Sequence, residues 1–206
     1  MARAETVVVI GGSLGGFQAL SKLAGLLPPD FPAPILAALH THPDGPRFLV
    51  RIIRTCTSLK AVYGQNNEIV RPGTIYIAPP DRHLVVTARG VIGLSNGPKV
   101  RYARPAVDPL FESAAKIYGP DVIGVVLSGG GRDGTDGMLA IREAGGVGIV
   151  QLPEDSRDSS MPLSALSSAS PDYQSSIEDI APLLARLVSD GSSSEPPLKN
   201  LSRPIG

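Results

Sequence analysis

Short apolar runs alternate along the chain with longer segments whose apolar residues recur every three to four positions. Residues 7–10 are four β-branched residues in succession, which is typical of a short buried strand. The glycine-rich residues 11–16 follow as a sharp turn, and residues 17–27 carry apolar side chains at helical spacing before Pro28 and Pro29. The chain therefore opens with a predicted strand, turn and helix.

The same alternation predicts the remaining elements. Further strands are expected over residues 33–39, 73–80, 122–128 and 147–152, with a hairpin over 83–95 that turns near Arg89 and Gly90. Helices are expected over 47–55, 108–117, 135–144 and 176–188. Strands that alternate with helices imply right-handed crossovers, so we expect an α/β fold: a single doubly wound, mostly parallel sheet flanked by helices, with an antiparallel hairpin.

Length and composition narrow the class of protein. A chain of 206 residues is most simply one domain, expected over residues 1–189, and the Ser- and Pro-rich residues 190–206 are expected to form a flexible tail. The 19 basic and 19 acidic residues cancel, which argues against nucleic acid and anionic membranes as partners. With one cysteine, Cys56, no internal disulfide can form, and we expect this residue in the core.

Targeting signals are not evident in the sequence. No apolar run approaches the roughly 20 residues that a membrane-spanning helix needs. The first residues lead directly into the predicted strand without the basic and apolar regions of a signal peptide. We therefore expect a cytoplasmic protein that does not insert into membranes.

Three residues with catalytic chemistry follow three predicted strands. Ser13 follows the first strand, His40 follows the second, and Asp133 lies in the loop after residues 122–128. In an open α/β sheet, ligands bind beyond the carboxyl ends of the strands, so these loops are expected to converge. Serine is a weak nucleophile that needs a base, and the imidazole needs a carboxylate to hold its tautomer. A Ser-His-Asp relay is therefore the leading hypothesis.

The turn around Ser13 has two alternative interpretations. Residues 11–15 match the G-x-S-x-G nucleophile elbow, but a glycine turn before a helix can also bind a phosphate or serve only as a tight turn. The dinucleotide fingerprint G-x-G-x-x-G is absent, because Ser13 and Leu14 occupy the positions where its second glycine would fall, and no P-loop lysine follows.

The histidines and Asp133 also have alternatives. His40 and His42 form an H-x-H pair that could bind a metal, although no third ligand stands at a familiar spacing. His42 precedes a proline in a loop, where a solvated histidine is ordinary, and His83 is expected to order a turn or cap the hairpin. Asp133 could simply cap the helix that follows it.

Taken together, the motifs resemble the catalytic domain of the CheB-type chemotaxis receptor methylesterases. The resemblance runs over residues 7–166 in order and rests on IGGSLGG, RPGTIYIAPPDRHL, RPAVDPLFESAA, GVVLSGGGRDGTDGMLAIREAGG and MPLSAL. It implies a hydrolase that removes methyl groups from glutamyl γ-methyl esters of chemoreceptors and can deamidate glutamine. Such an enzyme uses no metal or cofactor, and its partner is a methyl-accepting receptor or a similar signalling protein.

The resemblance also assigns residues. The family's serine, histidine and aspartate fall on Ser13, His40 and Asp133, and its oxyanion donors fall on the backbone amides near Leu14 and Gly130. This sequence departs from the family at Leu14, Leu39, Gly130 and Arg132, where threonine, glutamine, methionine and asparagine are common. Regulated members carry a receiver domain in front, whereas about six residues precede the first predicted strand here, so the site is expected to be either constitutively open or controlled by a separate regulatory protein.

Two other classes of function stay open at this point. The departures around the triad are compatible with a catalytically weak binding or scaffold module in a signalling complex. The glycine turn alone is compatible with an anion- or nucleotide-binding α/β domain.

Overall fold

A computed structural model describes residues 6–41 and 48–190. Seven strands form one sheet in the spatial order β10 (Tyr173–Ser175), β9 (Val147–Gln151), β8 (Val122–Val126), β1 (Val7–Gly12), β2 (Ile35–Leu39), β5 (Thr74–Ile77) and β3 (Lys60–Tyr63). Each neighbouring pair in this sheet is parallel. All six residues of β1 are buried, because this strand lies at the centre of the sheet with helices on both faces.

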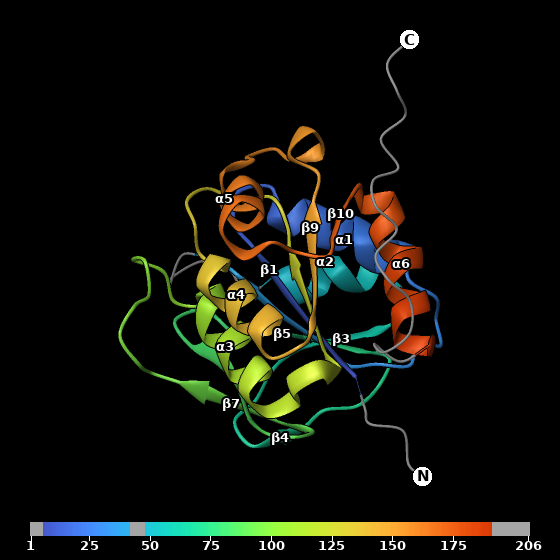
Figure 1. Cartoon of the computed structure of the whole chain (residues 1–206). Helices are drawn as coiled ribbons and strands as arrows, with labels where there is room; N and C mark the ends of the chain where they lie inside the picture. The colour runs from blue at the N-terminus through green and yellow to red at the C-terminus, as the bar shows by residue number, and fades with distance from the viewer. Residues whose placement is uncertain (1–5, 42–47, 191–206) are drawn as a thin grey trace.

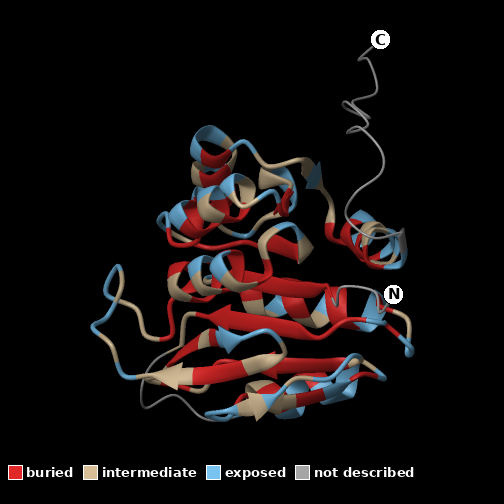
Figure 2. Ribbon diagram, turned by 60° about the horizontal axis from the view of Figure 1, so that its bottom comes forward, coloured by how far each residue is buried: buried red, intermediate tan, exposed pale blue. Residues whose placement is uncertain are grey.

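Helices cover both faces of the sheet (Figure 1). One face packs against α1 (Gly16–Leu26), α2 (Leu49–Cys56) and α6 (Ile177–Asp190) through apolar residues such as Leu20, Ile53 and Leu184. The other face packs against α3 (Val107–Tyr118), α4 (Thr135–Glu143) and α5 (Ser160–Ala169) through residues such as Phe111 and Met138. The buried residues in Figure 2 accordingly run along the central strands between two helical layers.

A second, smaller sheet extends the α3 side of the molecule. It is antiparallel, with β7 (Val91–Ser95) between β4 (Glu68–Ile69) and β6 (His83–Ala88). The β6–β7 turn contains Arg89 and Gly90, and Gly90 has φ 77°, which suits glycine at a tight turn. Two short 3₁₀ helices, Gly119–Asp121 and Pro153–Asp155, complete the regular structure.

The expected fold class is confirmed. The strands and helices predicted from the apolar pattern are present with ends shifted by a few residues, and the predicted hairpin belongs to the separate antiparallel sheet. The pattern did not predict β3, β4, β10 or α5. The predicted flexible tail lies outside the described residues, except Asp190. No helix in the described part of the chain has the length and apolar character that a membrane crossing requires.

The expectation for Cys56 is wrong, because this residue is exposed. The buried residues of α2 are Val50 and Ile53, and at about 100° per residue Cys56 lies about 120° around the helix axis from Val50, at the flank of the buried face. Cys56 is also the last residue of the helix, and its side chain is exposed there.

Candidate active site

The three candidate catalytic residues lie at the carboxyl edge of the parallel sheet. In the strand register, Gly11 pairs with Ala38 of β2 and with Val126 of β8, so the loops that follow these three strands begin at the same level. The chain runs from β1 to β2 on one side, and β8 pairs with β1 on the other side. Crevices at such a reversal of strand order are where doubly wound sheets bind ligands.

His40 and Asp133 form a hydrogen-bonded pair. The His40 Nε2 lies 2.6 Å from Asp133 Oδ2, and the His40 side chain remains 21% exposed while that of Asp133 is 1% exposed. The pKa of Asp133 lies below its ordinary value: burial acts to raise it, but hydrogen bonds from His40 and from two backbone amides stabilise the carboxylate more strongly. Asp133 is therefore an anion that fixes the imidazole, and Nδ1 is the ring nitrogen left for a proton transfer.

Ser13 stands on the turn between β1 and α1. Its amide donates to Ser128 O at 3.0 Å, its carbonyl accepts from Gly16 N at 2.8 Å, and Gly15 has φ 85°. Val7 and Val9 of β1 face the α3–α4 side, as do Leu36 and Ala38 of β2.

Continuing the alternation of side chains along each strand places Ser13 and His40 on that same side. No hydrogen bond joins the Ser13 hydroxyl to His40 in this structure. Catalytic hydrogen bonds often tighten only when substrate is bound.

Gly129 allows the loop after β8 to approach Ser13 closely. A Cβ atom on Gly129 would lie 2.8 Å from both the Cβ and the backbone nitrogen of Ser13, and 2.2 Å from Met161 Sδ. Such distances exclude any side chain at this position, so Gly129 is a condition for the placement of Ser13.

Two backbone amides are candidate oxyanion donors: that of Leu14, which follows Ser13, and that of Gly130, which follows Gly129. Neither the Leu14 amide nor the Gly130 amide donates a hydrogen bond to another described residue, whereas the Gly129 amide donates to Asp158 O at 2.9 Å. Preorganised amides of this kind stabilise the negative charge of a tetrahedral intermediate. The Leu14 side chain is exposed, so the group that Leu14 offers to the site is its backbone amide.

A residue that sequence analysis did not single out, Asp108, completes the support of Asp133. Asp133 accepts hydrogen bonds from the Val107 and Asp108 amides at 2.7 and 3.0 Å, at the start of α3. Asp108 in turn accepts from the Gly134 and Gly137 amides at 2.8 and 2.9 Å, at the start of α4. Each carboxylate thus binds the first turn of the other residue's helix, where backbone amides are unpaired and the helix dipole favours an anion.

Burial also affects the protonation of Asp108. Burial raises the pKa of Asp108 to about 6. The hydrogen bond from the Gly137 amide acts to lower this pKa, and the nearby Asp133 charge acts to raise it further. Arg101 Nε lies 3.2 Å from Asp108 Oδ2 and compensates part of the buried charge. The sequence signal for Asp108 was an aspartate in the first turn of an apolar helix.

The other positions at which the sequence departs from the family are Leu39, Arg132 and Gly130. Leu39 is buried among apolar residues on the α1–α2 side of the sheet, opposite to His40. The Arg132 side chain is 56% exposed and pairs with Asp136 at 3.0 Å, as expected for a solvated loop charge. Gly130 lies near Asp158, whose carboxylate oxygen would be 3.0 Å from a Cβ at this position.

The remaining histidines do not join the site. His83 is buried, its Nε2 lies 3.0 Å from Pro98 O, and its Nδ1 accepts from Ala106 N, so it orders the segment that precedes α3. His42 lies outside the described residues. Within residues 6–41 and 48–190, no three His, Cys, Asp or Glu side chains gather as a metal site would require.

Comparisons with known proteins agree on one family. The family model described as CheB methylesterase matches residues 8–184. A Leptospira interrogans protein is 37% identical over 182 residues, which cover 87% of this chain and 93% of that protein. A Caulobacter vibrioides protein named protein-glutamate methylesterase/protein-glutamine glutaminase 2 is 44% identical over 148 residues, which cover 70% of this chain and 43% of that protein.

The structural comparison gives the same result. The crystal structure of the Thermotoga maritima CheB methylesterase catalytic domain superposes with a TM-score of 0.85 and 34% sequence identity, covering 89% of this chain and 98% of that chain. Sequence, fold and the arrangement at the sheet edge lead to one conclusion: the chain belongs to the CheB methylesterase family.

Proposed function

We propose that this protein is a protein-glutamate methylesterase that hydrolyses glutamyl γ-methyl esters of chemotaxis receptors and also deamidates glutamine. Ser13 is the nucleophile, His40 the general base and Asp133 the residue that orients it. The observation that carries the proposal is the 2.6 Å contact between His40 and the buried Asp133 at the edge where Ser13 stands. The relatives' names give the substrate class.

The first half of the proposed reaction forms an acyl-enzyme. The Ser13 Oγ attacks the ester carbonyl carbon while His40 Nδ1 accepts the hydroxyl proton, and the negative oxygen of the tetrahedral intermediate binds the Leu14 and Gly130 amides. The bond to the methoxy group then breaks, and His40 returns the proton so that methanol leaves. With a glutamine substrate the same step releases ammonia.

The second half restores the enzyme. Water attacks the acyl-serine carbonyl, His40 accepts a proton from the water, and collapse of the intermediate returns that proton to Ser13 Oγ and releases glutamate. Asp133 stays ionised throughout and stabilises the imidazolium, because its lowered pKa keeps the proton on His40. Every proton transfer in this scheme passes through His40, to or from the Ser13 hydroxyl, the leaving group or water, while Asp133 and the two amides stabilise charge.

Active-site labelling tests the proposal against its two alternatives. A fluorophosphonate should label Ser13, as identified by peptide mass spectrometry, and the Ser13→Ala variant should stay unlabelled. Release of methanol from a methylated receptor fragment should be lost in the same variant. An unlabelled Ser13 would favour a scaffold module, and stabilisation by nucleotides without labelling would favour an anion-binding domain.

A further inference from the structure

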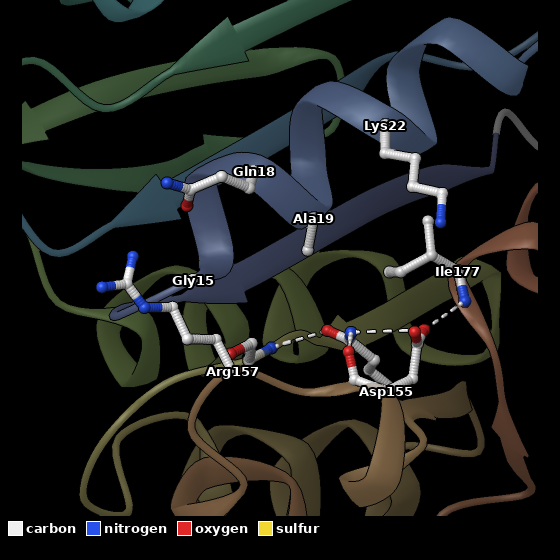
Figure 3. Close-up of a pocket in the computed structure, with 9 residues that line it drawn as sticks. Gly15, Gln18, Ala19, Lys22, Asp155, Arg157 and Ile177 are labelled. Atoms are coloured by element: carbon white, nitrogen blue, oxygen red, sulfur yellow. Dashed lines mark hydrogen bonds between the residues drawn. The ribbon is translucent and has the colours of Figure 1, made fainter.

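A cavity lies on the side of the Ser13 turn that faces α1 and α6. It has a volume of about 230 Å³ and is formed by the start of α1, the ends of β8 and β9, the 155–157 segment and the start of α6. In Figure 3 the Arg157 and Gln18 side chains both extend to the left near Gly15, and all three residues line the cavity. The His40–Asp133 pair contacts α3 on the other face of the sheet.

The charges around this cavity do not all have partners. The Lys22 ammonium pairs with the Glu178 carboxylate, and Asp155 accepts a hydrogen bond from the Ile177 amide at 3.0 Å. The exposed Arg157 guanidinium forms no ion pair with any residue that the structure describes. Arg157 is therefore the one lining cation without a described carboxylate, beside a Gln18 amide that can add one donor.

Arg157 is close enough to Ser13 to contact the same bound segment. A Cβ atom on Gly15 would lie 2.7 Å from the Arg157 Cβ, so Arg157 sits directly on the turn. The Cα atoms of Ser13 and Gly15 are at most about 7.6 Å apart, because consecutive Cα atoms are 3.8 Å apart. One turn of an α-helix is about 5.4 Å. The Arg157 Cβ therefore lies within about 12 Å of the Ser13 Cα, and the long arginine side chain can bring its guanidinium to groups one to two helical turns from an ester at Ser13.

We propose that Arg157, assisted by Gln18, binds a carboxylate of the substrate one to two helical turns from the ester or amide under attack. This rests on the proposed function and extends it to the substrate's neighbouring side chains. Guanidinium groups bind carboxylates through two parallel hydrogen bonds, which suits a glutamate side chain.

The proposal has a consequence for the order of hydrolysis. Hydrolysis of a glutamyl ester turns a neutral side chain into a carboxylate, so one completed site supplies the ligand for Arg157 when the next site is attacked. Segments with several sites are then hydrolysed faster after the first event.

Matched peptides test the proposal. Each helical peptide carries one glutamyl methyl ester and, four or seven residues away, either glutamate or alanine; alanine is chosen because glutamine is itself a candidate substrate. Methanol release should show a KM about three- to fivefold lower for the glutamate peptide, in line with partly exposed ion pairs. Arg157→Gln should remove this difference without changing kcat for the alanine peptide.

Arg132→Gln is the matched control, because it removes an equal charge from a loop at the same edge of the sheet. It should leave the preference for glutamate intact. Equal KM values for both peptides in the wild type, or equal loss of preference in both arginine variants, would overturn the proposal.

A binding measurement separates this proposal from the proposed function. Fluorescence anisotropy of the labelled glutamate and alanine peptides with Ser13→Ala reports affinity without turnover. If the wild type hydrolyses neither peptide but Ser13→Ala binds the glutamate peptide more tightly, and Arg157→Gln in that background abolishes the difference, the esterase function fails and the carboxylate site stands. If the wild type hydrolyses both peptides and Ser13→Ala binds them with equal affinity, the esterase function stands and the carboxylate site fails.

Discussion

The two sides of the turn at Ser13 are built in different ways. On the α3–α4 side, the carboxylates of Asp133 and Asp108 are buried and accept hydrogen bonds from His40, Arg101 and the backbone amides of two helix starts. On the α1–α6 side, a cavity of about 230 Å³ is lined by an exposed arginine without a described ion pair.

From this difference we infer that the α3–α4 side performs the reaction and that the α1–α6 side binds the substrate. A proton transfer needs its donor and acceptor held at a fixed distance, which buried and fully hydrogen-bonded groups provide. Binding of a flexible acidic segment tolerates movement, so a solvated guanidinium on a loop suffices. Substitutions on the α3–α4 side should therefore change activity strongly, and substitutions on the α1–α6 side should change it weakly.

The largest effect is expected for His40. His40→Ala should lower kcat by at least about 10³-fold, as for triad members in other enzymes, because no other described base is held by Asp133. His42→Ala is the control and should keep near wild-type turnover of a methyl ester. A severe loss in His42→Ala together with a mild one in His40→Ala would show that the base is misassigned.

Substitution of Gly129 should disturb the packing around Ser13 while Ser13, His40 and Asp133 themselves are kept. Gly129→Ala forces a Cβ against Ser13 and Met161, so we expect about 1–3 kcal/mol less stability and at least a tenfold loss of kcat. Gly131 is the control: nothing lies within 4 Å of its Cβ position, and its φ of 82° adds only backbone strain. Gly131→Ala should cost about 1 kcal/mol, and equal kcat losses in both variants would contradict the steric explanation.

Removal of Asp108 should destabilise the same side. Asp108→Ala leaves the buried Gly137 amide without an acceptor and leaves the Gly134 amide with Asp133 alone, and the free energy of unfolding should fall by about 1–3 kcal/mol in urea denaturation. Asp108→Asn keeps an acceptor oxygen and should lose less. If the two variants are equally stable, the hydrogen bonds to these amides do not contribute as argued.

The pH dependence of stability should also depend on Asp108. Its pKa is raised to about 6 in the folded protein, whereas an unfolded aspartate titrates near 3.9. Between these values the folded state binds the proton and the unfolded state does not, so this group stabilises the fold as pH falls from 6 to 4 and opposes folding as pH rises through 6.

The contribution of Asp133 has the opposite sign, since its pKa is lowered, and is lost only below its ordinary value. The difference in Tm between wild type and Asp108→Asn should therefore change across pH 4–6 and be flat from pH 7 to 8. A flat difference across the whole range would refute the raised pKa.

The smallest effect is expected for Arg132. Its side chain is exposed and already paired with Asp136, and exposed pairs of this kind contribute less than about 1 kcal/mol. Arg132→Asn should change the KM for an acidic receptor fragment by less than twofold at any salt concentration. A larger, salt-sensitive rise in KM that is absent for a small neutral ester would show that Arg132 steers the substrate.

The apolar pattern predicted most of the fold because buried strands and amphipathic helices that are long enough show this pattern in their sequences. It did not predict β3, β4 and β10, which have four, two and three residues, too few for a period to show. The helix α5 contains Pro162 and several serines, which weaken a helical pattern. Cys56 was misplaced because it lies at the flank of the buried face of α2, about 120° around the axis from Val50.

The site was predicted to the extent that topology determines it. Three strands that end together bring Ser13, His40 and Asp133 to one edge, and the contact between His40 and Asp133 follows from that rule. Asp108 was not identified because its partners lie 26 and 29 residues away in another helix. Arg157 gave no sequence signal, since its position on the Ser13 turn depends on how the 153–159 segment folds back over α1.

The reciprocal binding of α3 and α4 by Asp133 and Asp108 has a consequence for how this enzyme loses activity. If the two helices separate, the Val107, Asp108 and Gly137 amides lose their carboxylate acceptors and only Gly134 keeps one, Asp133 Oδ1, so the two starts form one cooperative unit that opens as a whole. Asp133 is part of that unit, and a brief detachment releases the imidazole of His40 while the central strands remain intact. Heat inactivation would then precede global melting, and amide hydrogen exchange would show Val107, Asp108 and Gly137 opening together.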